Sequence, residues 1–439
     1  MIRRLVTFGA AAAATLAIAG SHADDWPGID NLAGTWQNAA SMIARGRATF
    51  RFDNFGNEDF WGGALRLHQA IAGTANGGVG PGVSPATALS VGLKVDSQML
   101  PKQLVRALKQ NQVPLDDPAT TLALLKLNAV VGVKGFFDDY GRITSIGITC
   151  ALCHSTVDNS FAPGIGARRD GWPNRDLNVG AIIALSPSVA PFAQLLGTDE
   201  ATVRTVLNGW GPGKFDAEML MDGKTQGPLG SSATLIPPAF GLAGVNLHTF
   251  EGWGSVTHWN AFVAVLEMQG KGTFYDPRLK DASKFPIAAA NHFDDVRRTP
   301  DLVTPKLGAL HFYQLAIPPP EPPKGSYDRR AAARGEALFA ADGKAHCATC
   351  HVPPLYTEPG YNMHTPEEIG IDGFQAERAP DNRYRTTPLR GLWSHQKGGF
   401  YHDGRFATLA DVVTHYNTFQ GLGLTNGEQH DLVEYLKSL

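Results

Sequence analysis

The chain has 439 residues, of which 43% are hydrophobic and 18% charged, so it can build a buried core and is not a disordered protein. Its 38 basic and 41 acidic residues give a formal charge of -3, which argues against nucleic-acid binding because that function calls for a basic surplus. The 49 glycines and 29 prolines predict long irregular connections.

The first 23 residues are typical of a signal peptide. Two arginines precede an apolar stretch at residues 5–19, which is short for a membrane span, and Ser21-His22-Ala23 places small residues where a signal peptidase reads. We expect cleavage after Ala23 and a periplasmic protein with no membrane span. An uncleaved anchor is the alternative, and the two aspartates that follow at once disfavour it.

The four cysteines lie in two copies of one pattern, Cys150-Ala151-Leu152-Cys153-His154 and Cys347-Ala348-Thr349-Cys350-His351. In c-type haem attachment the two thiols bond to the haem vinyl groups, and the adjacent histidine ligates the iron. About 0.001 such matches are expected by chance in a chain of this composition. A redox dithiol pair or a four-cysteine zinc site would not need the histidines. The pattern therefore predicts two covalent haems, with His154 and His351 as iron ligands.

The motifs begin at residues 150 and 347, too far apart for one small cytochrome. We expect a mainly α fold of two cytochrome c-like haem domains with long irregular loops. The N-terminal domain covers residues 24–316, a stiff proline-rich linker covers 317–325, and the C-terminal domain covers 326–439.

Helical patterns support this division. Residues 331–339 (AAARGEALF) favour a helix before the second motif, and residues 432–439 carry an apolar stripe at helical spacing. Residues 44–52 (ARGRATFRF) echo the first of these helices. Helical segments at 97–110 and 120–131 follow a glycine-rich stretch, so we interpret about 66–140 as a helical insertion in the N-terminal domain, or a cap on it.

Two further sets of short sequence motifs resemble those of a known family. The runs YRTTPLR at 384–390 and FYHDG at 400–404 resemble the bacterial di-haem cytochrome c peroxidase family. That family includes the tryptophylquinone-maturing di-haem enzymes and, more distantly, the haem rubber oxygenases. Residues 236–238, 250–254 and 266–268 resemble its proline, tryptophan and glutamate-methionine series. The resemblance covers roughly 145–270 and 330–439, and residues 24–140 lie outside it.

The resemblance implies a peroxidatic N-terminal haem and an electron-donating C-terminal haem. It implies Tyr416 as the second iron ligand of the C-terminal haem, where a phenolate would favour ferric iron and lower the potential. His415 is the alternative, because imidazole is also a good iron donor. A half-buried helical tyrosine without a ligand role is the plainer interpretation of Tyr416.

At the N-terminal haem the resemblance implies Glu267 as the acid that takes a proton from peroxide and returns it to the leaving oxygen. It implies Trp253 as an aromatic group between the haems, with Trp259 and Trp393 as alternatives. An ordinary surface glutamate and plain aromatic packing are the other interpretations of Glu267 and Trp253.

The removable distal histidine of most family members has no counterpart, since no histidine lies between His154 and His248. The simplest interpretation is an open iron face, which His248, His258 or Met268 would instead close as a sixth ligand. The arginines of residues 168–176 are candidates for pairing with haem propionates, or for a solvated loop. A family calcium site is left open, because residues 395–399 (HQKGG) depart from the usual stretch.

The sequence therefore predicts a peroxidase-like oxidoreductase. Electrons from a small redox protein, such as a cytochrome c or a cupredoxin, would enter at the C-terminal haem. They would pass to the N-terminal haem and reduce peroxide or support oxidation of a bound substrate. The alternatives are a di-haem electron carrier without catalysis and an oxygenase of the rubber-oxygenase type that uses dioxygen.

Overall fold

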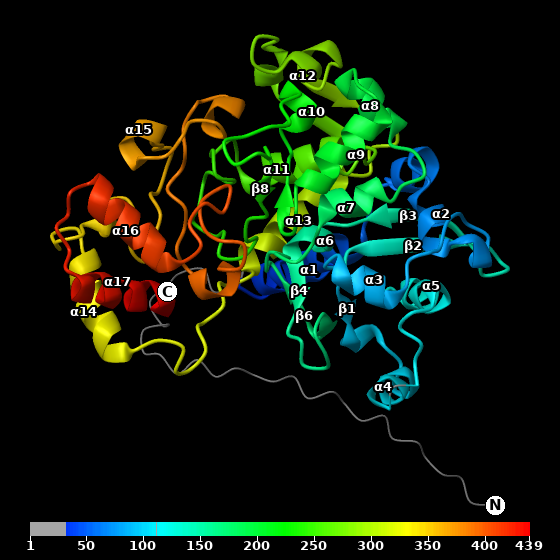
Figure 1. Cartoon of the computed structure of the whole chain (residues 1–439), viewed down its shortest axis with the longest axis horizontal. Helices are drawn as coiled ribbons and strands as arrows, with labels where there is room; N and C mark the ends of the chain where they lie inside the picture. Colours follow the sequence, from blue (N-terminus) through cyan, green and yellow to red (C-terminus); the bar gives the residue numbers. More distant parts are fainter. Residues whose placement is uncertain (1–31, 111) are drawn as a thin grey trace, which may run out of the picture. The chain divides into compact units, whose positions relative to one another are not determined.

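The computed structural model describes residues 32–110 and 112–439 (Figure 1). The predicted signal peptide lies outside the described residues. The described chain is mainly helical, as predicted, and its strands pair into five two-stranded sheets. None of the helices in this part has the length and apolar character that a bilayer span needs. Residues 32–41 and residues 42–439 fall into separate units, and all contacts below lie within the second.

Most helices precede the proline-rich segment: α1 (Leu32–Phe52), α2 (Leu67–Ala72), α3 (Pro85–Ser90), α4 (Lys102–Lys109), α5 (Pro118–Lys126), α6 (Ala151–His154), α7 (Val179–Ala184), α8 (Ala190–Leu196), α9 (Glu200–Gly209), α10 (Met219–Asp222), α11 (Val256–Phe262), α12 (Pro286–Ala290) and α13 (Thr304–Ala316). After it come α14 (Arg329–Phe339), α15 (Pro366–Ile369), α16 (Leu409–Phe419) and α17 (Asn426–Ser438). Two π-helical turns also lie before the proline-rich segment: η2 (Asp59–Ala64) and η5 (Val263–Glu267).

The strands are short, and four of the five pairs are antiparallel: β2 (Val133–Phe137) with β3 (Ile143–Ile148), β4 (Ser155–Val157) with β6 (Arg168–Asp170), β7 (Lys214–Phe215) with β8 (Thr234–Leu235), and β9 (Thr273–Tyr275) with β10 (Asp295–Arg297). The parallel pair is β1 (Val95–Asp96) with β5 (Ile165–Gly166). The β4–β6 register places Ser155, the residue after the first haem motif, opposite Asp170.

In the N-terminal part (residues 42–316), α1 crosses α13 at Gly46. A Cβ atom at this glycine would overlap the carbonyl oxygen of Ala309 and lie 2.5 Å from the Cβ of Tyr313. One turn later, Phe50 packs edge-on against Tyr313 with ring centroids 5.7 Å apart. Glycine is needed here because only a residue without a side chain lets the two backbones approach this closely.

In the C-terminal part (residues 326–439), α14 crosses α17 in the same way. A Cβ at Gly335 would overlap the carbonyl oxygen of Asp431 and lie 2.8 Å from the Cβ of Tyr435. Phe339 then packs against Tyr435 at 5.1 Å. The sequence echo between residues 44–52 and the helix of residues 331–339 thus corresponds to equivalent helices, each crossing the last helix of its own part.

Separate apolar cores accompany these crossings. The largest includes Phe50, Trp253 and Phe262, and a second, which includes Phe339 and Leu432, belongs to the C-terminal part. A third cluster around Leu125 and Val130 lies under the predicted insertion, which contains α2 to α5 and also β1 and β2. The predicted helix at 120–131 ends at Lys126, and the one at 97–110 is split at Pro101 into a short turn and α4.

The proline-rich segment lies between the end of α13 and the start of α14 and has no regular structure. Hydrogen bonds nevertheless fix its course. The Gly241 amide donates to the carbonyl of Ile317 at 2.9 Å, and the Trp393 indole donates to the carbonyl of Pro320 at 3.0 Å. The segment therefore contacts both the N-terminal and the C-terminal part.

Candidate haem sites

The first haem motif lies in α6 between β3 and β4, and Asp170 anchors it. This carboxylate on β6 accepts hydrogen bonds from the Ser155 hydroxyl at 2.9 Å, from Arg51 of α1 at 2.5 Å and from the Tyr313 hydroxyl of α13 at 2.5 Å. The two crossing helices are thereby tied to the residue that follows His154. Because all three donors are polar groups with little exposure, the connection holds the motif rigidly against the helix pair.

His154 is oriented as an iron ligand would need to be. Its Nδ1 lies 3.2 Å from the carbonyl oxygen of Pro237, a contact that requires the proton on Nδ1 and leaves the lone pair of Nε2 free. Burial lowers the pKa of His154 to about 4, so the ring is neutral at physiological pH. A neutral imidazole whose other nitrogen is held by a carbonyl is the usual arrangement of a metal-binding histidine.

Glu267, at the end of η5, lies near this motif. Both of its carboxylate oxygens are buried without a hydrogen-bond partner. Burial raises the pKa of the Cys153 thiol, and the negative charge of Glu267 adds to the rise. Burial raises the pKa of Glu267 itself well above the ordinary value, and the neighbouring Glu218 and Asp216 add to the rise. An unpartnered buried carboxyl group beside a haem-attachment cysteine fits a haem whose bound ligand exchanges protons.

The second haem motif opens onto a cavity of about 300 Å³, within the size range of cofactor sites. The Nδ1 of His351 lies 3.1 Å from the carbonyl oxygen of Tyr356, so its Nε2 is free in the same way as that of His154. The walls carry both thiols of the motif and a largely apolar lining, which includes Phe339, Leu409, Val413, Leu432 and Leu436.

Two arginines give this cavity an anion-binding rim. Arg175 and Arg385 both line it, and each has a buried guanidinium nitrogen without a partner, Nε of Arg175 and Nη1 of Arg385. Burial lowers the pKa of each to about 10, which still leaves both charged. Haem carries two propionates, and unpaired arginines are the groups that bind carboxylates best. Arg168, by contrast, is paired with Asp96 at 3.0 Å.

The structure separates Tyr416 from its rival His415. Tyr416 lines the cavity, and the two thiols of the second motif, together with burial, raise its pKa. His415 lies outside the lining; its Nε2 is 3.2 Å from the carbonyl oxygen of Ile369, and its ring stacks on Phe419. Of the pair, Tyr416 therefore lines the cavity at the second motif, and its role as an iron ligand stays a prediction.

Trp253 lies in the first core. Its indole donates to Asp276 at 3.1 Å, its ring stacks on Phe285, and it does not line the second cavity. Trp393 packs edge-on against Trp172 with centroids 5.3 Å apart, which joins the C-terminal part to the segment after the first motif. The role of Trp253 between the haems stays a prediction.

The other candidate sixth ligands have partners of their own. The Nε2 of His258 lies 3.0 Å from Asp276, and the Nε2 of His248 lies 3.1 Å from the carbonyl of Val245. Met268 is buried in the first core, where its carbonyl accepts a hydrogen bond from the Trp61 indole. These contacts involve only Nε2 of each histidine and the backbone of Met268, so the sixth ligand of the N-terminal haem stays a prediction.

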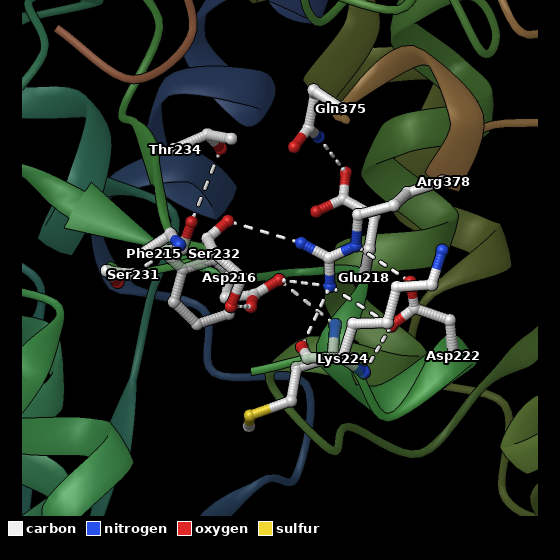
Figure 2. A network of polar contacts seen from close by, with 12 residues as sticks. Phe215, Asp216, Glu218, Asp222, Lys224, Ser231, Ser232, Thr234, Gln375 and Arg378 are labelled. Atoms are coloured by element: carbon white, nitrogen blue, oxygen red, sulfur yellow. Dashed lines mark hydrogen bonds and ion pairs between the residues drawn. The ribbon is translucent and has the colours of Figure 1, made fainter. Parts of the chain in front are cut away.

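Arg378 joins the two parts of the chain through a buried ion-pair network (Figure 2). It has no exposed side-chain surface and donates to Asp222 at 2.7 Å and to Asp216 at 2.9 Å. Nearby, Gln375 donates to Glu218 at 2.7 Å. Sequence reasoning missed these residues, because they lie in segments that match no motif, and the acidic run from 216 to 222 was the only cue.

A second group of possible ligands lies at the family's histidine-aspartate-glycine stretch. The ligand atoms of Asp372, His402 and Asp403 lie within 4.8 Å of one another. Arg405 pairs with both carboxylates, with Asp403 at 2.6 Å. One guanidinium thus offsets half of the charge of the two carboxylates, and a calcium ion stays an open question at these residues.

The structure is that of a mainly helical protein, and its two CxxCH motifs are consistent with c-type haems. The chain is distantly homologous to cytochrome-c peroxidase IdrP1 of Denitromonas iodatirespirans, to which it is 30% identical over 153 residues, covering 25% of this chain and 40% of that protein. The chain thus matches less than half the length of this relative. The match confirms the resemblance to cytochrome c peroxidases as a distant one, and it is consistent with c-type haems at both motifs.

Other comparisons add little. No family model matches the chain. A solved structure of Kuenenia stuttgartiensis hydrazine synthase, pressurised with 20 bar xenon, aligns with 49% of this chain and 76% of that chain at 20% identity, with a TM-score of 0.27. A score this low does not bear on function.

Proposed function

We propose that this protein is a periplasmic di-haem c-type cytochrome oxidoreductase of the peroxidase type. A small redox protein delivers electrons at the C-terminal site, and they pass to the N-terminal site, where hydrogen peroxide is reduced or a bound substrate is oxidised. The observation that carries the proposal is the carboxyl group of Glu267, both oxygens of which are buried without a hydrogen-bond partner and whose charge acts on the Cys153 thiol. The distant relationship to a cytochrome-c peroxidase supports a haem-dependent oxidoreductase.

Each side chain has a defined task in this proposal. Bound haem supplies the redox chemistry at both sites. Covalent attachment uses the four cysteines, and His154 and His351 provide Nε2 to iron from rings held by backbone carbonyls. Arg175 and Arg385 would hold the propionates at the second site, and Tyr416, which lines the same cavity, would be a ligand of the iron.

Glu267 performs the proton transfer. Its carboxylate would take a proton from one oxygen of peroxide and return it to the other oxygen, which leaves as water. Burial supports this task, because a carboxyl group with a raised pKa holds a proton long enough to deliver it and releases it without a large cost. The apolar residues of the first core exclude bulk water from the exchange.

Electron paramagnetic resonance of the holoprotein, matured in a periplasm, tests the proposal. Spectra are recorded fully oxidised and half-reduced, each before and after one equivalent of peroxide. The expected result is a high-spin ferric signal that peroxide abolishes, which requires an open iron. Two low-spin signals that ignore peroxide in both states would instead identify an electron carrier.

A further inference from the structure

Glu267 ends a continuous helix whose last turn is wider than the rest. The helix α11 runs directly into the π-turn η5, where the Met268 amide donates to the carbonyl of Val263, five residues back, at 2.7 Å. Such turns are rare and occur frequently at functional sites. The carbonyls at the end of a helix lack partners within it, so groups from elsewhere must satisfy them.

Two side chains from distant segments supply these partners. The Trp61 indole, in η2, donates to the carbonyl of Met268 at 2.9 Å. The Arg298 guanidinium, directly after β10, donates to the carbonyls of Val265 at 2.9 Å and Gly270 at 3.0 Å. Because neither donor belongs to α11 or η5, the position of the turn depends on where these two segments lie.

Trp61 is in turn fixed to the strand that leads into the first haem motif. Its amide donates to the carbonyl of Asn57 at 3.0 Å. The fully buried Asn57 side chain donates to the carbonyl of Ile148 at 2.9 Å and accepts a hydrogen bond from the amide of Ile148 at 3.1 Å. Ile148 ends β3, two residues before Cys150. Short chain segments and hydrogen bonds therefore connect the attachment site to the turn that carries Glu267.

We propose that Trp61 and Arg298 are positioning residues that together fix Glu267 relative to the first haem motif. The inference rests on the proposed peroxidase function, in which Glu267 transfers the proton. Both residues act through the backbone of the turn and take no part in the transfer itself. Proton transfer requires the carboxyl group within hydrogen-bond reach of peroxide, so a displaced turn leaves the acid present but misaligned.

The test compares the Trp61→Phe holoprotein with wild type and with Trp393→Phe. Phenylalanine keeps an aromatic ring at each position and removes an indole hydrogen bond, from Trp61 to Met268 or from Trp393 to Pro320. Infrared difference spectra against Glu267→Gln, recorded in mildly acidic solution, assign the C=O stretching band of the protonated Glu267 carboxyl group. A hydrogen bond weakens the C=O bond and lowers the frequency of this band. Peroxide turnover is measured at saturating donor.

In wild type we expect a high-frequency band, because both carboxyl oxygens of Glu267 lack a partner. Trp61→Phe should lower the frequency, since the released turn lets the carboxyl group reach water or another donor. It should also lower kcat about 10- to 100-fold with little change in KM. Trp393→Phe should leave the band at its wild-type frequency.

A haem-loaded Trp61→Phe protein with the wild-type band would overturn the inference, whatever its turnover. So would a wild-type spectrum without a band that Glu267→Gln removes, because the carboxyl group would then not be buried and protonated. A wild type that reduces no peroxide would instead refute the peroxidase function, while the band would still decide whether Trp61 positions Glu267.

Where Trp61→Phe yields no haem-loaded protein, Arg298→Lys replaces it. Lysine keeps the charge but lacks the planar fork that reaches two carbonyls, so the band must shift. Arg204→Lys is the matched control, because Arg204 also donates to a backbone carbonyl, that of Ser186 at 2.9 Å, away from η5. An unshifted band in Arg298→Lys, or an equal shift in Arg204→Lys, overturns the inference.

Discussion

Gly46 of α1 lies against the carbonyl oxygen of Ala309 of α13, and Gly335 of α14 has the same relationship to Asp431 of α17. In both crossings a tyrosine four residues further on receives a phenylalanine from the first helix. Along the chain, each haem motif lies between the two helices that cross: the first motif between α1 and α13, the second between α14 and α17. The division into two cytochrome c-like domains stays a prediction, and the equivalence of the two crossings is the observation that favours it.

This crossing makes a prediction about stability. Gly335→Ala should lower the free energy of unfolding by about 1–3 kcal/mol, because the added methyl group would overlap the backbone of α17. Gly427→Ala, in α17 itself, is the control: its nearest atom would be 4.0 Å away, and alanine favours a helix. Denaturant unfolding of the two variants should therefore move in different directions, and equal effects would contradict the proposed close contact.

The buried network at Arg378 makes a second prediction. Arg378→Met should cost about 3–5 kcal/mol of stability, since it leaves the buried carboxylates of Asp216 and Asp222 without a cation. The loss should shrink in mildly acidic solution, where protonation removes the uncompensated charge. The exposed pair of Arg297 with Asp295 is the control, and Arg297→Met should change stability little. Unfolding curves at two pH values measure both effects.

The proton-transfer role of Glu267 predicts the pH dependence of turnover. Glu267 can act as a base only when its carboxyl group is ionised. Its pKa is raised well above the ordinary value of 4.5. We therefore expect kcat/KM for peroxide to rise as the pH passes through this raised pKa. Glu267→Gln should lower kcat/KM by about 10² to 10⁴-fold and remove this rise. Unchanged haem content and an unchanged optical spectrum are the controls. A variant that keeps the wild-type profile would exclude Glu267 as the base.

Tyr416 gives a prediction about redox potential. Phenolate ligation stabilises ferric iron, so Tyr416→Phe should raise the midpoint potential of the C-terminal haem, and Tyr416→Met should raise it further. His415→Leu should leave the potential near that of wild type, because His415 is bound to the Ile369 carbonyl outside the cavity. Potentiometric titration followed optically measures each value. A shift in His415→Leu alone would assign the ligand to histidine.

Much of the chemistry follows from local sequence. Two thiols and a histidine at fixed spacing define haem attachment without reference to the fold, because the spacing itself sets the thiols against the haem vinyl groups. The mainly helical fold and the helix before the second motif follow from apolar periodicity, which acts over a few turns. The similarity of residues 44–52 to that helix is also visible in the sequence. That the two segments form equivalent helix crossings is seen only in the structure.

The remaining features depend on contacts between distant residues. No local pattern distinguishes Tyr416 from His415, since adjacent residues on a helix point about 100° apart and only the packing of α16 decides which faces the cavity. The unpartnered state of Glu267 and the pairing of Arg378 with Asp216 depend on segments more than a hundred residues apart. The sequence thus determines which cofactor the chain can attach, because covalent chemistry is local. The tertiary structure alone decides which acids lie near it, because burial and charge are properties of the assembled core.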